Sequence, residues 1–312
     1  MSFRITGNMM FKRLLSNVRI ATSTLGDLQE QMVSLRRINR PSDDPAGASR
    51  AAVLKTDEAD YKQYTTNIDS ARGMLDFTAS VLEAVSEQVV AVRGKLMAAI
   101  NPTSGESSRE VAANEIDNIL NSIVGQANSS FAGMFILGGT QTDRPPFEIT
   151  AKGIGGIESV SYNGNSGRIR YVVGTDHQVN VNEDPVEVFM PRGEALGVFQ
   201  SLIDVRKLLQ NPDDLSAGDL GRELSEKLSV VDDIHSDIIR SLGRAGTRSR
   251  ALQIRRDLYS KAQISAATQR SELEDADIAD VALRLQNQQV IFQVVLAGSA
   301  AVYSSNLMEF LR

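Results

Sequence analysis

Residues 61–99 read YKQYTTNIDSARGMLDFTASVLEAVSEQVVAVRGKLMAA, and apolar or small side chains recur in this stretch at alternating steps of three and four residues. The recurring positions are Tyr61, Tyr64, Ile68, Ala71, Leu75, Thr78, Leu82, Val85, Val89, Val92, Leu96 and Ala99. This spacing places them on one face of a helix. Pro45 and the pair Asn101-Pro102 bracket the pattern, so we predict one helix over 45–100, about 80 Å long at 1.5 Å per residue. A helix of that length favours a rod over a compact globule.

Both ends of the chain carry a comparable pattern. In the N-terminal region the seam positions are Leu14, Val18, Ala21, Leu25, Leu28, Met32 and Leu35. In the C-terminal region they are Ile278, Val281, Leu285, Phe292, Val295 and Val302, with Gln288 and Ser299 at the remaining places. Such heptad spacing is typical of coiled-coil helices. The N-terminal pattern stops at a turn whose prolines and capping side chains suit a helix boundary, namely Arg40, Pro41, Ser42, Asp43, Asp44 and Pro45.

Between these regions the period changes twice. Ser107 and Glu110 have the spacing of a capping box that opens a third helix. Short β-type runs then follow, at 147–150, 157–162, 168–173, 179–181 and 186–190, separated by Gly-rich or Asn-rich turns. Helical periodicity resumes at about Gly193 and breaks at Asn211-Pro212, and a last long helix has Gly243 and Gly246 as its expected weak point. The sequence therefore predicts a mainly α protein with a small β insert, built as a rod of long antiparallel helices.

Composition excludes several functions. The 33 basic and 39 acidic residues give a net charge of −6, which argues against nucleic acid or an anionic membrane as the main partner. The chain has no Cys and only 2 His, so thiolate catalysis, disulfides and a histidine metal triad are absent, and we predict no cofactor and no metal. The C-terminal stretch has few charges, but glutamine, asparagine and serine interrupt it, which disfavours a membrane anchor.

A search for catalytic groups finds one candidate. Gly164-Asn165-Ser166-Gly167 has the form of a nucleophile turn, but it lies in an expected hairpin with no assigned base. His177 and His235 fall in different elements, and each is better explained as a structural histidine. A hydrolase that uses Ser166 as its nucleophile is kept as one alternative. The prediction is that the chain is not an enzyme.

The terminal seams need a partner, because an isolated helix with an exposed apolar stripe is marginally stable. Residues 1–37 hold six basic and two acidic residues, whereas 271–312 hold six acidic and two basic ones. This asymmetry favours antiparallel docking of the two ends. The Ala297-Gly298-Ser299-Ala300-Ala301 run permits close helix packing, which favours many packed copies. The alternative is an intramolecular coiled coil. Under the first hypothesis, residues 1–40 and 275–312 are mobile in the free protein.

Two signatures resemble the flagellin superfamily. Residues 37–48 (RINRPSDDPAGA) are similar to its N-terminal signature, and 272–279 (ELEDADIA) with 285–289 (LQNQQ) are similar to its C-terminal one. The opening residues 1–10 and the runs 135–142, 145–147 and 162–165 resemble the hook–filament junction proteins of this superfamily more than its filament subunits. Asn165 departs from the aspartate often found there.

The resemblance implies a structural adaptor that forms a ring between the flagellar hook and filament. It also implies export without a cleaved signal peptide and an extracellular location at the hook–filament junction. The implied partners are further copies of the chain, hook-associated protein 1, flagellin and an export chaperone. Residues 1–40 and 275–312 would form the inner layer as assembly helices, 41–135 and 193–274 the helical middle layer, and 136–192 the β-rich outer domain. The turn 40–45 would connect the inner and middle layers. A short flagellin that builds the filament itself is the second alternative.

Overall fold

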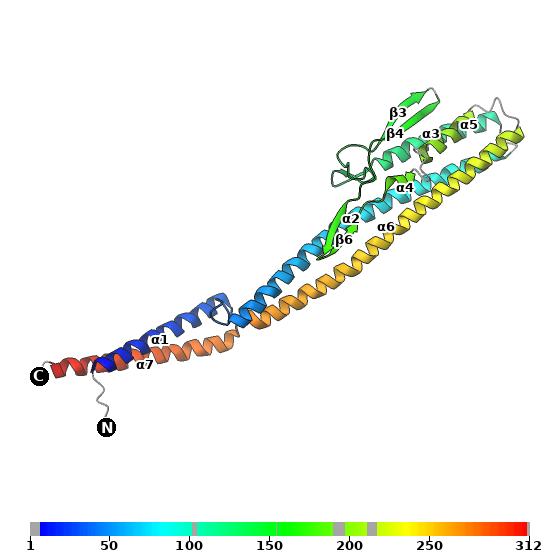
Figure 1. The fold of residues 1–312 in the computed structure, drawn as a ribbon. Coiled ribbons are helices and arrows are strands. Elements are labelled where there is room, and N and C mark those ends of the chain that lie inside the picture. Colours follow the sequence, from blue (N-terminus) through cyan, green and yellow to red (C-terminus); the bar gives the residue numbers. More distant parts are fainter. Residues whose placement is uncertain (1–6, 102–104, 154, 190–196, 211–216, 311–312) are drawn as a thin grey trace. The chain divides into compact units, whose positions relative to one another are not determined.

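The computed structural model describes residues 7–101, 105–153, 155–189, 197–210 and 217–310 (Figure 1). The chain divides into two compact units, one of Met1–Lys62 with Lys261–Arg312 and one of Gln63–Ser260. Two long helices, α2 (Pro45–Ile100) and α6 (Ala217–Glu274), contribute to both units. The first six residues of the opening segment 1–10 and the expected boundary at 192–193 lie outside the described residues.

The predicted long helix is confirmed as α2, with the boundaries that the flanking prolines indicate. Within the second unit its buried face includes the predicted positions Ile68, Ala71, Leu75, Thr78, Leu82, Val85, Val89, Val92 and Leu96, and also Met74, Val81 and Ser86. Thr78 is polar, and its hydroxyl donates to the Met74 carbonyl at 2.8 Å. The burial of Thr78 therefore leaves no unpaired hydroxyl in the core.

Helix α6 runs antiparallel to α2 in the second unit. Side-chain hydrogen bonds between the helices show this direction, because later positions of α2 pair with earlier positions of α6: Asp69 with Arg256 at 2.6 Å, Asp76 with Ser249 at 2.6 Å, and Arg93 with Asp232 at 2.7 Å. Exposed pairs of this kind contribute only about 0.2–1 kcal/mol each. The buried apolar face, with Leu224, Val231, Ile238 and Leu252 from α6, therefore supplies most of the stabilisation.

Gly243 and Gly246 do not interrupt α6, contrary to the expected weak point. Ala245, which lies between them, is fully buried. Each glycine costs only about 1 kcal/mol relative to alanine in a helix, and tertiary burial outweighs this cost. The helix is continuous because its packing decides its conformation.

Two shorter helices complete the helical part of the second unit. Helix α3 (Glu106–Ala127) packs against α5 (Gly197–Gln210) through buried side chains such as Ile116, Leu120 and Leu202. The predicted capping box is wrong: Gly105 is the N-cap of α3, no side chain caps it, and Ser107 lies inside the first turn. The N-cap lies two residues before the serine that the box requires.

The described strands pair only as antiparallel two-stranded sheets. The strand β3 (Phe147–Gly153) pairs with β4 (Gly156–Tyr162), and β5 (Arg170–Gly174) pairs with β6 (His177–Asn180). A minimal hairpin of β1 (Ser130–Phe131) and β2 (Met134–Phe135) was not predicted. Its turn uses positive φ at Ala132 and Gly133, so the Ala-Gly pair is the signal that could have revealed it.

The fifth expected strand, 186–190, is wrong, because Pro185–Phe189 forms the short helix α4. Asp184 precedes it, and its Oδ1 accepts the Val186 N–H at 3.0 Å. An aspartate cap followed by proline at the first helical position is a helix-start signal, and it outweighs the β-type composition of Val-Glu-Val-Phe. With this change, the predicted fold class of long helices with a small β insert is confirmed.

The insert is anchored to the helices by an aromatic cluster and two buried charge groups. The Phe147 ring lies 5.1, 5.2 and 5.1 Å from those of Tyr162, Phe189 and Phe199. Arg206 is 1% exposed, and its Nη1 donates to Asp117 Oδ1 at 2.7 Å.

The second charge group lies after β6. Glu183 is 2% exposed and accepts hydrogen bonds from Arg244 at 3.2 Å and Arg248 at 2.7 Å. Both arginines are on α6, so this buried carboxylate ties the end of the β insert to the long helix.

Candidate assembly site

Helices α1 (Gly7–Ser34) and α7 (Ile278–Phe310) lie side by side and antiparallel in the first unit (Figure 1). The predicted seam positions form the contact. On α1 the seam side chains with reduced exposure are Leu14, Val18, Ala21, Leu25, Leu28 and Met32, and on α7 they are Val281, Leu285, Gln288, Phe292, Val295 and Ser299. Gln288 Nε2 also donates to the Ala21 carbonyl at 3.3 Å. The seams therefore find a partner within one chain, which is the alternative that the sequence left open. With this pairing present in a single copy, we expect α1 and α7 to be protected in the free protein, in place of the mobile ends that the many-copy hypothesis predicts.

Three of the predicted seam residues are not seen as covered side chains in the contact between α1 and α7. Leu35 falls outside the helix, because α1 ends at Ser34 and Leu35 adopts a left-handed conformation with φ 59°. Its side chain is 52% exposed, and so is that of Ile278 at the first position of α7. The side chain of Val302 lies outside the described part of the chain. A role of the seam in assembly stays a prediction.

The opposite side of α7 carries a second apolar stripe. Leu283, Val290 and Val294 recur at steps of seven and four, which puts them on one face, about half a turn away from Val281 and Leu285. They are 63%, 56% and 65% exposed. We call Leu283, Val290 and Val294 the outer stripe. A helix that is apolar on opposite sides is typically covered on both, yet within one chain α1 covers only one.

The turn between α1 and α2 is held by two aspartates. Asp43 Oδ2 accepts the backbone N–H groups of Arg40 at 2.8 Å and Asn39 at 3.0 Å. Asp44 Oδ1 accepts the Gly47 N–H at 2.9 Å and so caps the start of α2. The predicted turn 40–45 is thus a turn in the structure, built by its aspartates. Its layer-connecting role stays a prediction.

The two signature segments lie against each other, although more than 230 residues separate them. The N–H of Arg37 donates to the Glu274 carbonyl at 2.6 Å, and the N–H of Ala276 donates to the Leu35 carbonyl at 3.0 Å. The Arg37 side chain adds a bond from Nη2 to the Leu273 carbonyl at 2.7 Å. This short antiparallel bridge fixes where α7 starts relative to α1, and Asp277 Oδ1 caps α7 by accepting the Ala279 N–H at 2.9 Å.

Gly47 has no room for a side chain. A Cβ at this position would lie 2.5 Å from Asp44 Oδ2 and 2.7 Å from Ile38 Cδ1. We therefore expect Gly47→Ala to destabilise the first unit by about 1–3 kcal/mol through overpacking, measured by chemical denaturation with amide exchange as the local readout. The matched control is Gly26→Ala in α1, where a Cβ would meet nothing within 4 Å, and this change should stabilise by about 0.5–1 kcal/mol. Equal effects of the two changes would contradict the packing of the turn.

Acid should loosen the same turn. The hydrogen bonds from the backbone N–H groups of Arg40 and Asn39 hold the pKa of Asp43 below its ordinary value. The folded turn therefore gains stability above the ordinary aspartate pKa, and it loses this gain as the pH falls through the lowered folded pKa. We expect amide exchange at Asn39 and Arg40, corrected for its intrinsic pH dependence, to accelerate in that acidic range. In Asp43→Asn this acid dependence should disappear, and its persistence would assign it to another group.

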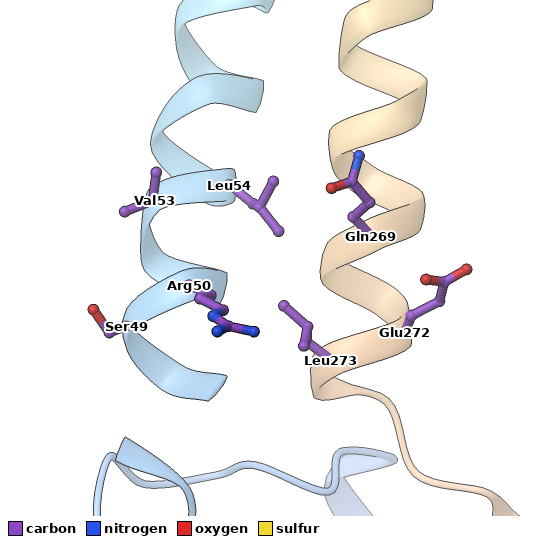
Figure 2. Close-up of a pocket in the computed structure, with 7 residues that line it drawn as sticks. All are labelled: Ser49, Arg50, Val53, Leu54, Gln269, Glu272 and Leu273. Atoms are coloured by element: carbon purple, nitrogen blue, oxygen red, sulfur yellow. The ribbon is translucent and has the colours of Figure 1, made fainter. Parts of the chain in front are cut away.

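An open groove of about 480 Å³ lies next to this turn, between α2 and α6 (Figure 2). Leu54 of α2 and Leu273 of α6 point toward the opposite helix in Figure 2. Val53 also lines the groove and is 59% exposed. Arg50 on α2 and Glu272 on α6 supply one charge of each sign. Sequence periodicity did not predict this groove, because its two sides come from segments more than 200 residues apart.

The candidate nucleophile turn in the β insert is held by hydrogen bonds of the Asn165 side chain. Asn165 Oδ1 accepts N–H groups from Thr140 at 2.9 Å and Gly167 at 2.8 Å. Asn165 Nδ2 donates to Thr140 Oγ1 at 2.9 Å. The amide donates and accepts, which a carboxylate would not do, so the departure from aspartate has a physical reason. Ser166 is exposed, His177 lies on β6 and His235 on α6.

Among the helices that the structure describes, none is long and apolar enough to cross a membrane.

Comparisons with known proteins agree with the signatures. Residues 5–142 match the family model of the bacterial flagellin N-terminal helical region. Flagellar hook-associated protein 3 of Salmonella typhimurium is 30% identical over 178 residues, which is 56% of this chain and 56% of that protein. Flagellar hook-associated protein 3 of Escherichia coli is 25% identical over 285 residues, 88% of this chain and 89% of that protein. The chain thus aligns with little more than half of the Salmonella protein.

A solved structure shares the fold. The crystal structure of flagellar hook associated protein-3 from Legionella pneumophila superposes with a TM-score of 0.61 at 14% identity, and the match covers 71% of this chain and 98% of that one. The chain is therefore similar over residues 5–142 to the bacterial flagellin N-terminal helical region, and it resembles two relatives named flagellar hook-associated protein 3.

Proposed function

We propose that this chain is a structural adaptor that forms a junction ring between the flagellar hook and the flagellin filament. In this role it contacts hook-associated protein 1 on the hook side and flagellin on the filament side. It is exported by the flagellar type III apparatus without a cleaved signal peptide, helped by an export chaperone, and works outside the cell. Two relatives named hook-associated protein 3 support this location.

The observation that carries the proposal is the outer stripe of α7. One copy of the chain covers the stripe that faces α1, yet leaves Leu283, Val290 and Val294 more than half exposed. Burial of a large aliphatic side chain contributes about 1.5–3 kcal/mol, so three of them on one helix favour association over solvent exposure. Terminal helices packed between copies in an inner layer provide that cover. The rest of the chain then forms the middle and outer layers, with 136–192 outermost.

No catalytic group is needed for this role. Ser166 lies beside a turn whose hydrogen bonds already have a structural use. We therefore expect Ser166→Ala to leave motility unchanged.

The experiment that tests the proposal is localisation. Gold-labelled antibody against the full chain, applied to isolated flagella, should mark a single site where hook and filament meet. Labelling along the whole filament would instead support the second candidate, a short flagellin, which the match to the flagellin N-terminal helical region favours. Seeded growth separates the two candidates again, because a flagellin elongates into filaments whereas the adaptor stops at a ring.

A further inference from the structure

We propose that the groove between α2 and α6 receives the start of the outer stripe from a neighbouring copy, with Leu283 as the inserted side chain. This inference rests on the proposed assembly and names the two surfaces that meet in it. The groove is lined by Val53, Leu54 and Leu273, which gives it an apolar floor. In the single chain Leu283 is 63% exposed, so it does not occupy the groove of its own copy.

Charge complementarity identifies the occupant. The groove has one cation and one anion in its lining, Arg50 and Glu272, and both side chains are exposed. A partner with several charges of one sign would bring a like charge against either Arg50 or Glu272. The stripe that fits must be apolar and must carry at most one charge of each sign.

The beginning of α7 meets this requirement. Asp280 and Arg284 flank Leu283 and pair with each other, with Arg284 Nε 2.8 Å from Asp280 Oδ2. Over 281–308 Arg284 is the only charged residue. When Leu283 enters the groove, Arg284 can face Glu272 and Asp280 can face Arg50. Every charge at the contact then has an opposite neighbour, and the remaining surface is apolar.

The contact is heterologous, because the stripe of one copy meets the groove of another. Such contacts repeat from copy to copy and close into a ring when the rotation allows it. A self-complementary contact would stop at a dimer. The inferred pair of surfaces therefore suits an assembly of many copies.

The chain has no cysteine, so disulfide trapping tests the contact cleanly. Gln269→Cys places a thiol on an exposed position that lines the groove, and Leu283→Cys places one on the stripe. Cells that lack the natural chain express the two single variants together, and their isolated flagella are oxidised. We expect a disulfide-linked dimer from the mixture and none from either variant alone. Ile254→Cys, a 64% exposed position on α6 outside the groove, replaces Gln269→Cys in the negative control.

The oxidation itself needs a positive control. Arg36→Cys with Asp275→Cys in one chain joins the two partners of the antiparallel bridge, and such partners have Cα atoms about 4.5–5.5 Å apart, so this pair should close within the chain. If it closes and the assembled mixture of Gln269→Cys and Leu283→Cys gives no dimer, the groove inference is wrong while the proposed function stands. A dimer of Gln269→Cys with a different flagellar protein would also overturn it.

Reversal of the charges at Glu272 and Arg284 tests the same contact independently, in case a cysteine variant fails to assemble. Glu272→Arg alone and Arg284→Glu alone should each lower the amount of chain in isolated flagella about fivefold, the factor for a contact of ~1 kcal/mol. The double variant should recover the normal amount. Lack of recovery would contradict the pairing of Glu272 with Arg284. Absence of the natural chain from the hook–filament junction would instead contradict the proposed function.

Discussion

Val294→Asp is expected to abolish incorporation of the chain into flagella while leaving α1 and α7 paired in the free protein. Val294 is 65% exposed in a single copy, so a carboxylate there stays hydrated and costs little. Burying the same carboxylate without a partner at a contact between copies costs several kcal/mol, and each 1.4 kcal/mol lowers the association constant tenfold. The measurement is the amount of the variant in purified flagella, beside its circular dichroism and amide exchange as a free chain.

Leu285→Asp is the matched change on the other side of the same helix. Leu285 faces α1, so the charge enters the contact within one chain. We expect this variant to lose amide protection along α1 and α7 already in the free protein, and to fail in assembly for that reason. Val230→Asp, on α6 in the second unit, is the neutral control at a 39% exposed position. Normal incorporation of Val294→Asp would show that the outer stripe has no neighbour.

Asp117→Ala should have the largest effect on the stability of the second unit, about 3–5 kcal/mol. Removal of this carboxylate leaves the Arg206 guanidinium, which is 1% exposed, without its partner. The Ile157 N–H loses its acceptor as well, which now lies at 2.9 Å. These groups join α3, α5 and β4, so the insert and the two short helices should loosen together.

Chemical denaturation with amide exchange can separate the two units in this variant. Protection should fall in α3, α5 and β4, whereas the paired α1 and α7 should exchange as in the natural chain. Arg206→Met is the matched variant, because it replaces the buried cation by an apolar side chain of similar length and leaves Asp117 partly solvated. It should cost less than Asp117→Ala. A smaller cost for Asp117→Ala would show that the buried arginine does not depend on this carboxylate.

The long helices could be predicted because their signal is periodic and local. The seam of α2 repeats over many turns, and Pro45 marks its start unambiguously. The short elements were harder to predict, since five residues give no period. In α4 the cap at Asp184 and the first-position Pro185 decided the outcome, although the side chains that follow favour a strand.

The candidate site was only half visible in the sequence. A seam search finds the stripe with the strongest heptad pattern, and on α7 that is the stripe that α1 covers. The outer stripe lies on the same helix, about half a turn away. Sequence periodicity alone does not indicate which of the two stripes is covered within a single copy of the chain. The groove and the bridge from Arg37 to Glu274 depend on tertiary proximity, which periodicity does not contain.

The proposed assembly depends most on the cover of the outer stripe by other copies, and alkylation of a single thiol tests this cover directly. In Val290→Cys the thiol stands on the outer stripe of a chain with no other cysteine. It should react rapidly with maleimide in the free protein and become strongly protected in intact flagella, while Ile254→Cys serves as a reference for general access. Equal reactivity of Val290→Cys in the free protein and in intact flagella would show that no neighbouring copy covers the outer stripe.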